Sequence, residues 1–271
     1  MNKKYCQYCG TELSSDAIFC SHCGAKIAEN PSDVTAVTTI QNAIMRRSET
    51  DIRMSGAWIL ILIVSPLISF LGLISMFSPT MIYIGSLLIF LSMILVALLY
   101  YKLINRRNKH FMRSRILRES LINYIESKSK KLGKSNDVAS ELSIMRIIHS
   151  ELSNVEKDRS AGLYAFLSAV TPFVSLYIMY FLTKEFTAHD SKERTFFQTF
   201  SVAADKLGMS VQFPSWIELP SRPAGLYLIL TIIFGGLFAI YWLWTLIKDP
   251  NLHFDTHTIF EDSLLSSINT Y

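Results

Sequence analysis

Residues 57–77 read AWILILIVSPLISFLGLISMF and residues 80–103 read TMIYIGSLLIFLSMILVALLYYKL, with only two residues between them. As α-helices that rise about 1.5 Å per residue, both stretches are long enough to cross about 30 Å of hydrocarbon. Because the connection is so short, we expect residues 57–103 to form a tight antiparallel transmembrane hairpin. Half of the residues are hydrophobic and only 18% are charged. The sequence therefore predicts a mainly α fold, that of a polytopic helical membrane protein.

The basic residues around this hairpin predict its orientation. Arg46, Arg47 and Arg53 precede the first stretch, and the second stretch runs into Lys102. Since Lys and Arg are retained on the cytoplasmic side of membrane helices, we expect both flanks in the cytoplasm and the short turn outside. The first residues are polar and basic and lack the apolar core of a secretory signal. We therefore expect a multi-pass protein of the cell membrane with a cytoplasmic N-terminus.

Residues 104–158 are predicted to form two basic, amphipathic, cytoplasmic helices. Between Lys102 and Lys134 the sequence has eleven Lys or Arg residues and only two acids. Apolar residues recur at helical spacing on both sides of Gly133, a typical helix stop. We interpret the segment as a helical hairpin whose second helix is able to pair with another helix. The basic residues either attract anionic lipid or only set the orientation, and the sequence leaves both readings open.

The four cysteines of the chain form two pairs, Cys6-x-x-Cys9 and Cys20-x-x-Cys23, each followed by a glycine. Four thiolates at this spacing can close a tetrahedral shell around one Zn2+, and two disulfides are the alternative. In the reducing cytosol such a set usually holds metal. Residues 1–27 are too few to bury a stable core, so we expect this zinc ribbon to depend on structural Zn2+. Residues 28–56 are polar and predict a linker, with a short helix near residues 40–45.

The rest of the chain is predicted to contain a duplicated membrane unit, residues 159–221 and residues 222–271. Each copy begins with Arg-x-Ala-Gly-Leu-Tyr, at Arg159 and Arg222, and continues into an apolar segment that ends in Lys and an acid. An offset of about 64 residues relates further identical pairs, which are Tyr177 and Tyr241, Leu182 and Leu246, His189 and His253, and Phe196 and Phe260. So regular an offset indicates an internal repeat.

The path of each copy through the membrane is left open by the sequence. The apolar segments 161–183 and 225–247 are long enough for one kinked span each, which is the commoner outcome. Both segments have a helix breaker near the middle, Thr171-Pro172 in the first and Gly235-Gly236 in the second. Half-helices of ten to twelve residues reach only about mid-bilayer, so each segment could instead dip into the membrane and return.

Histidines and acids after these apolar segments suggest a second metal site. His253, His257 and Glu261 are spaced by four and would share one helical face. His189, Asp190 and Glu193 occupy the matching place in the first copy. Histidines near a membrane interface are more often hydrogen-bonded or solvated than bound to metal. If both copies face the cytosol, however, the two groups could pair into one site.

Two stretches resemble known families. Residues 5–10, Tyr-Cys-Gln-Tyr-Cys-Gly, and residues 19–24, Phe-Cys-Ser-His-Cys-Gly, resemble the zinc-ribbon modules at the N-termini of many bacterial and archaeal membrane proteins. In those modules a proline usually follows the first cysteine of each pair, whereas Gln7 and Ser21 stand there in this chain. Residues 226–249 are similar to a prokaryotic membrane domain with an aromatic-rich segment ending in Lys-Asp. Neither resemblance implies an activity; together they support a zinc ribbon joined to a duplicated aromatic-rich membrane domain.

The sequence points to a non-enzymatic function. A Zn2+ ion closed by four thiolates has no open position for a substrate, so we expect the ribbon to mediate protein interaction or assembly at the membrane. A channel or transporter regulated by the ribbon is the alternative. The runs 57–101, 161–183 and 225–247 contain no Asp, Glu, Lys, Arg or His, which disfavours a proton-coupled transporter. A membrane-shaping protein is a third possibility. Nucleic-acid binding is not expected, because acids offset the lysines of the ribbon.

Overall fold

The computed structural model describes residues 4–5, 11–13, 20, 33–211 and 213–268, and this part of the chain is mainly helical. Two short strands, β1 (Lys4–Tyr5) and β2 (Glu12–Leu13), pair in antiparallel fashion near the N-terminus. The helices are α1 (Asp33–Met45), α2 (Arg47–Thr50), α3 (Ile61–Ser75), α4 (Ile82–Lys131), α5 (Ala139–Val155), α6 (Ala161–Val170), α7 (Pro172–Lys206), α8 (Ala224–Ile233) and α9 (Phe238–Ile268), with a 3-10 turn at Gly56–Leu60 before α3.

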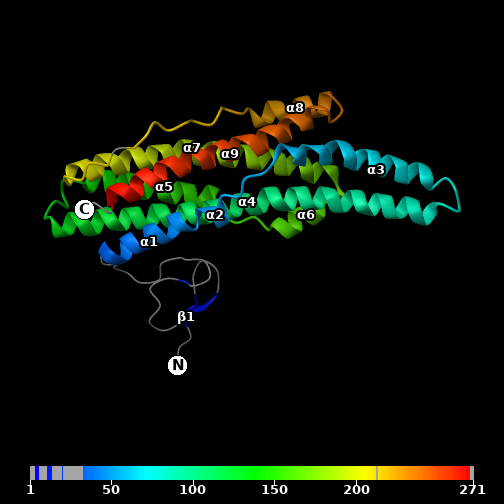
Figure 1. Cartoon of the computed structure of the whole chain (residues 1–271). Helices are drawn as coiled ribbons and strands as arrows, with labels where there is room; N and C mark the ends of the chain where they lie inside the picture. The colour runs from blue at the N-terminus through cyan, green and yellow to red at the C-terminus, as the bar shows by residue number, and fades with distance from the viewer. Residues whose placement is uncertain (1–3, 6–10, 14–19, 21–32, 212, 269–271) are drawn as a thin grey trace.

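The longest helix, α4, runs nearly the length of the molecule and organises the rest (Figure 1). The sequence predicted a membrane helix ending at residue 103 and a separate amphipathic helix after it. The structure corrects this, because α4 continues unbroken from the apolar half into the basic half. No glycine or proline occurs between residues 86 and 131 to end it. It stops at Gly133, whose φ of 67° is the left-handed conformation common at helix C-termini.

Helices α3 and α4 form an antiparallel hairpin with a close crossing. A Cβ atom on Gly72 would lie only 2.7 Å from the carbonyl oxygen of Gly85, so only glycine lets the two backbones approach here. Nearby, the hydroxyls of Ser65 and Ser92 lie 2.8 Å apart across the same contact. Both helices are long and apolar enough to cross a membrane, and only 11% and 17% of their most apolar windows are buried.

Each of the two later apolar segments turns back on itself. Helix α6 ends at the Thr171-Pro172 break and α7 returns beside it, so that the rings of Tyr164 and Phe181 lie 5.6 Å apart. Arg159, before α6, forms an ion pair with Glu185, beyond the apolar part of α7. A single straight span would hold these residues a membrane thickness apart. The geometry therefore fits the dipping alternative that the sequence left open.

Helices α8 and α9 have the same arrangement as α6 and α7. The rings of Tyr227 and Trp242 lie 5.8 Å apart, and Arg222 forms an ion pair with Asp249 at 2.8 Å. The turn uses Gly235 and Gly236, which both have positive φ. As a result, α7 and α9 leave their turns in the same direction and carry their histidines to the same end of the bundle (Figure 1).

The segment predicted as a linker, residues 28–56, instead contains helix α1, which packs against the bundle; we call residues 33–54 the arm. Helix α1 buries Ala36, Ile40, Ala43 and Ile44, one face of a helix, in the core beside α4. The sequence anticipated a short helix near residues 40–45, but the helix begins at Asp33 and packs along its whole length. Among the polar residues that suggested a linker, Thr38 and Asn42 are exposed, whereas Thr39 is buried.

A buried polar layer separates two apolar cores of the bundle. One core joins α1, α4, α5, α7 and α9, and the other joins α4, α7, α9 and the ends of the apolar hairpins. Four arginines of the basic stretch, for which lipid attraction and a role in orientation were both left open, are buried in or beside this layer: Arg106, Arg107, Arg113 and Arg118. Their guanidinium groups contact acids and backbone carbonyls inside the bundle, so these four do not form a lipid-facing surface in this structure.

Candidate metal centre

Four histidine rings and one carboxylate converge in the polar layer. They are His110 from α4, His189 and Glu193 from α7, and His253 and His257 from α9, and every one is fully buried. The spacing of four residues within α7 and within α9 puts each pair on one helical face. Helix α4 lies against both and supplies His110. The donor atoms of all five side chains lie within 4.8 Å of one another.

The Nε2 atoms point toward a common centre. Glu193 Oε2 lies 2.8 Å from His189 Nε2 and 2.8 Å from His257 Nε2. His110 Nε2 lies 3.2 Å from His189 Nε2 and 3.1 Å from His253 Nε2. One carboxylate oxygen and four ring nitrogens therefore surround a point that all of them can reach.

Each histidine is held from behind by its own carboxylate. The Nδ1 atom of His110 contacts Asp51 Oδ1 at 2.9 Å, and that of His189 contacts Glu156 Oε1 at 2.8 Å. The other two pairs are His253 with Asp190 at 2.8 Å and His257 with Glu261 at 3.0 Å. A carboxylate can only accept here, so each Nδ1–H donates and each Nε2 is left as the inward-facing nitrogen. This is the arrangement in which proteins present histidine to a metal ion.

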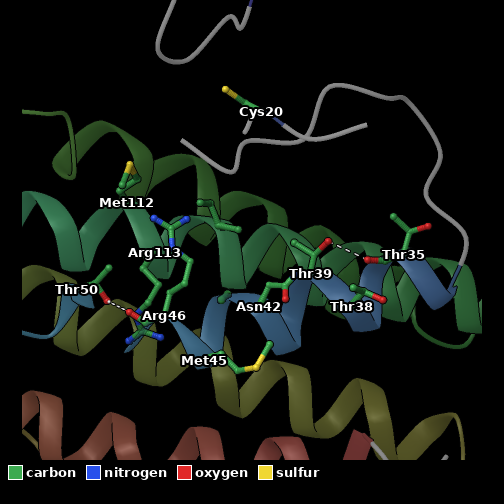
Figure 2. A pocket seen from close by; sticks show the side chains of 12 residues that line it. Cys20, Thr35, Thr38, Thr39, Asn42, Met45, Arg46, Thr50, Met112 and Arg113 are labelled. Carbon is green, nitrogen blue, oxygen red and sulfur yellow. Dashed lines mark hydrogen bonds between the residues drawn. The ribbon is translucent and has the colours of Figure 1, made fainter. Parts of the chain in front are cut away.

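Two buried arginines tie the outer carboxylates together. Arg113 donates to Asp51 Oδ2 at 2.7 Å and to Glu261 Oε1 at 2.6 Å. Arg118 donates to Glu193 Oε1 at 2.9 Å and to Glu156. Figure 2 shows Arg113 beside a cavity of about 570 Å3 between α1 and α4, which Thr50 and Cys20 also line. Thr50 in turn donates to Asp51 Oδ1 at 3.0 Å.

The charges of this layer favour a cation at its centre. Five buried carboxylates face the buried guanidiniums of Arg113 and Arg118, and Arg47 and Arg115 approach Glu261 and Glu156 from the rim at 3.6 and 3.9 Å, which leaves one negative charge among these groups while the rings are neutral. Burial lowers the pKa of His257, but the Glu193 and Glu261 carboxylates outweigh it and raise that pKa to about 10. Burial lowers the pKa of His253 to about 4, and its neighbour His257 adds to the effect. Nε2 lone pairs about 3 Å apart are repelled unless a proton or a metal ion lies between them.

Aromatic rings enclose the cluster. Phe111 stacks on His189 with centroids 4.5 Å apart, and Phe254 lies 4.7 Å from His110. Trp216 lies 5.4 Å from His257 and donates from Nε1 to Asp190. Such a shell excludes water and lowers the local dielectric, which strengthens charge interactions inside it. The donor set, its geometry and its enclosure fit one transition-metal ion held by His110, His189, Glu193, His253 and His257.

The sequence-based pairing hypothesis anticipated much of this site. His189 and Glu193 from the first copy meet His253 and His257 from the second. Asp190 and Glu261, which were grouped with them as ligands, lie behind the rings as partners of Nδ1. His110 was missed, as was its partner Asp51. The one available signal was a histidine at the helical spacing of the buried positions Leu103, Arg106 and Leu117 of α4.

The comparisons with known proteins bear on the N-terminus. Residues 5–27 match the zinc-ribbon domain family, so the chain begins with a zinc ribbon, a domain that typically binds structural zinc. Of the four predicted ligands, Cys20 is buried, whereas Cys6, Cys9 and Cys23 lie outside the described residues. No curated protein and no solved structure matches the chain.

Proposed function

We propose that this protein is a membrane-anchored metalloprotein in which one divalent transition-metal ion fastens the helical bundle and the zinc ribbon mediates protein interaction or assembly. The observation that carries the proposal is the convergence of four Nε2 atoms and one Glu193 oxygen, with a carboxylate behind every ring. All five side chains are fully buried, and as ionisable groups they add nothing to the packing of the apolar cores. The arrangement costs stability unless a cation occupies it.

Membrane anchoring is supported by exposed apolar side chains at one end of the bundle. Large hydrophobic residues lie on the outside of α3 and α4, with Phe77 and Tyr83 each 85% exposed, and Phe173 at the start of α7 is 81% exposed. A soluble protein rarely exposes so many. We infer that α3 and α4 cross the bilayer, that α6–α7 and α8–α9 dip into it, and that the ribbon and the histidine layer face the cytosol. The positive flanks of α3 and α4 favour the same orientation.

The ion in this proposal joins three helices that come from distant parts of the chain. It links α4 to α7 and α9, whose apolar hairpins are the two predicted copies of the repeat. Five buried protein donors suit a structural role, and in this proposal the protein is not an enzyme. Attached to this frame, the ribbon and the exposed face of α5 offer contact surfaces for a protein partner.

Metal analysis tests this function. The protein, purified in detergent, is expected to contain zinc in the ribbon and one further ion in the bundle. The variant His110→Ala with His257→Ala should lose the second ion only, and Cys6→Ser with Cys9→Ser should lose the ribbon zinc only. His149→Ala is the histidine control, since His149 is half-buried and is not one of the five converging donors. A wild-type protein with nothing beyond the ribbon zinc would refute the proposal.

A channel or transporter remains the second candidate, and one observation favours it. A cavity of about 820 Å3 lies among α3, α4, α6, α7 and the turn between α8 and α9. Its wall contains hydroxyl groups, including those of Ser65, Ser92, Ser168 and Thr231, and no charged side chain. Such a wall suits an uncharged solute or a lipid. Solute flux into proteoliposomes that Ser92→Leu abolishes would support transport, and absence of flux would leave the metal-fastened scaffold.

A further inference from the structure

We propose that the ion of the buried centre is six-coordinate ferrous iron rather than a second tetrahedral zinc. The inference rests on the proposed function, because it names the ion that the bundle would hold. It assigns to one chain two metal sites of different chemistry, a thiolate site in the ribbon and an imidazole-rich site in the bundle.

The spacing of the donors decides the coordination geometry. With metal–nitrogen distances of about 2.1 Å, neighbouring ligands of an octahedron lie about 3.0 Å apart and opposite ligands about 4.2 Å apart. In a tetrahedron of the same size, every pair lies about 3.4 Å apart. Four pairs in this cluster are separated by 2.8, 2.8, 3.1 and 3.2 Å, His253 Nε2 and Glu193 Oε2 by 3.7 Å, and no pair exceeds 4.8 Å. Separations on both sides of the tetrahedral value fit a distorted octahedron better than a tetrahedron.

The number of donors leads to the same geometry. Tetrahedral zinc would take four of the five donors and leave one inward-facing atom, a ring Nε2 or Glu193 Oε2, without the metal, which is costly in a buried site. Glu193 also cannot bind through both oxygens, because Oε1 accepts a hydrogen bond from Arg118 at 2.9 Å. The protein therefore supplies four nitrogens and one oxygen, and one position of the octahedron is left for a small ligand such as water.

The donor types narrow the choice of element. Imidazole suits zinc, copper, iron and nickel, whereas Mg2+, Ca2+ and Mn2+ prefer carboxylate, carbonyl and water oxygens. Copper in a reducing compartment is cuprous and prefers sulfur ligands. Among the ions that accept octahedral nitrogen-rich sites, iron is the one that a reducing cytosol supplies most abundantly in its divalent state. The choice of iron therefore follows from the coordination geometry and from the availability of the metal, which generally decide the metal bound at such sites.

The inference is tested by spectroscopy on the full-length protein, produced in cells grown on 57Fe and purified without oxygen. We expect one iron and one zinc per chain, and a Mössbauer spectrum of a single high-spin ferrous species with nitrogen and oxygen ligands. His110→Ala should abolish this signal and leave the zinc content unchanged. His149→Ala, which changes a half-buried histidine that is not among the five donors, should leave both unchanged.

The possible failures are distinguishable. Two zinc ions per chain, with X-ray absorption showing one of them bound by four nitrogen or oxygen ligands, would overturn the iron assignment and leave a metal-fastened bundle intact. Zinc at one per chain and no other metal, in protein purified from iron-replete cells, would overturn the metal centre itself. If His110→Ala does not fold, Asp51→Asn replaces it, because that change keeps a hydrogen-bond acceptor for His110 and should weaken the iron signal without abolishing the fold.

Discussion

At the scale of single residues, the centre depends on the carboxylates behind the rings as much as on the rings. Asp51 illustrates this, because it accepts from His110 Nδ1 at 2.9 Å and from Arg113 at 2.7 Å and is itself almost fully buried. Burial raises the pKa of this carboxyl, but its interactions with His110 and Arg113 outweigh burial and hold the pKa well below its ordinary value. Asp51 is therefore ionised and holds His110 in the tautomer that turns Nε2 inward.

We predict that Asp51→Asn lowers the affinity for the buried ion by about 10- to 100-fold, the usual cost of changing a partner behind a metal-bound histidine. The amide keeps the shape of the side chain but loses the charge that fixes the imidazole. Competition with a chromophoric chelator would measure the change. Glu151→Gln is the control, since Glu151 is exposed and pairs with Lys192 at the surface, away from the arm. Equal affinities in the two variants would contradict the role of Asp51.

The residues that sequence reasoning could and could not predict differ in one physical respect. The pairs His189–Glu193 and His253–His257 are local, because a spacing of four fixes a shared helical face before any tertiary contact forms. His110 and Asp51 reach the cluster only through the packing of α4 and of the arm, and no local pattern encodes that packing. Whether Asp190 and Glu261 face inward or support the rings was likewise decided by helix rotation within the bundle.

At the scale of elements, the arm formed by residues 33–54 closes one side of the centre. Its helix α1 packs on α4, and its last residues are held against α9 by hydrogen bonds and ion pairs. Arg47 donates to Asp262 at 2.9 Å, Arg53 pairs with Asp255, and Asn251 donates to the Met54 carbonyl at 2.9 Å. The zinc ribbon is attached to the start of this arm, so a partner bound to the ribbon could act on the centre through it.

We predict that removing the ion pairs between the arm and α9 speeds release of the ion from the buried centre. Exposed ion pairs contribute about 0.2–1 kcal/mol each, so Arg47→Ala with Arg53→Ala should raise the release rate about two- to tenfold. The rate is measured by transfer of the ion to excess chelator. The number of ions bound at the start should stay at the wild-type value, because neither arginine contacts a ligand directly.

A matched double variant on the other side of the bundle separates this effect from general destabilisation. Arg146→Ala with Lys192→Ala removes two exposed ion pairs, with Glu126 and Glu151, that lie away from the arm. It should release the ion at the wild-type rate. If both double variants speed release equally, the faster release reflects general destabilisation, and the arm has no specific role in closing the centre.

Helices and turns were predictable where a short connection, a proline or a glycine pair marks their ends in the sequence. The two-residue connection at Ser78-Pro79 fixes the α3–α4 hairpin, and Pro172 and Gly235-Gly236 mark the turns of the later apolar segments. The arm was misjudged because its apolar stripe is made of small and medium side chains, Ala36, Ile40, Ala43 and Ile44, in a polar background. The continuity of α4 was missed because a change in composition near residue 103 resembled a boundary, although nothing there breaks a helix.

At the scale of the whole molecule, the two metals are expected to stabilise different parts. A ligand that binds only the folded state stabilises it by about 4 kcal/mol when its free concentration is a thousand times Kd. Stripping the buried ion should therefore lower the midpoint of bundle unfolding by several degrees, followed by helical circular dichroism in detergent. Cys6→Ser with Cys9→Ser should leave that midpoint unchanged, because the residues of the two apolar cores that the structure describes all come from Ala36 onward. A bundle midpoint that does not depend on the ion would contradict its fastening role.

The proposed path of α6–α7 in the membrane and the proposed metal centre depend on each other. Asp205, exposed near the end of α7, lies on the cytoplasmic side if α6–α7 dips and returns, and outside if that segment spans. We predict that Asp205→Cys, in a variant with serine at positions 6, 9, 20 and 23, reacts with an impermeant thiol reagent only in broken cells. Thr80→Cys, at the tip of the α3–α4 hairpin, should react in intact cells and serves as the control.

Labelling of Asp205→Cys in intact cells would have a consequence beyond topology. His189 and Glu193 lie on the same helix as Asp205, beyond the apolar part of α7, and would then be outside the cell. His110 lies beyond the apolar half of α4, which the basic flanks keep in the cytoplasm. Side chains on opposite faces of a bilayer about 30 Å thick cannot share one ion. The labelling experiment thus tests the buried centre as well, and only a returning path lets the two copies and α4 meet around a single metal.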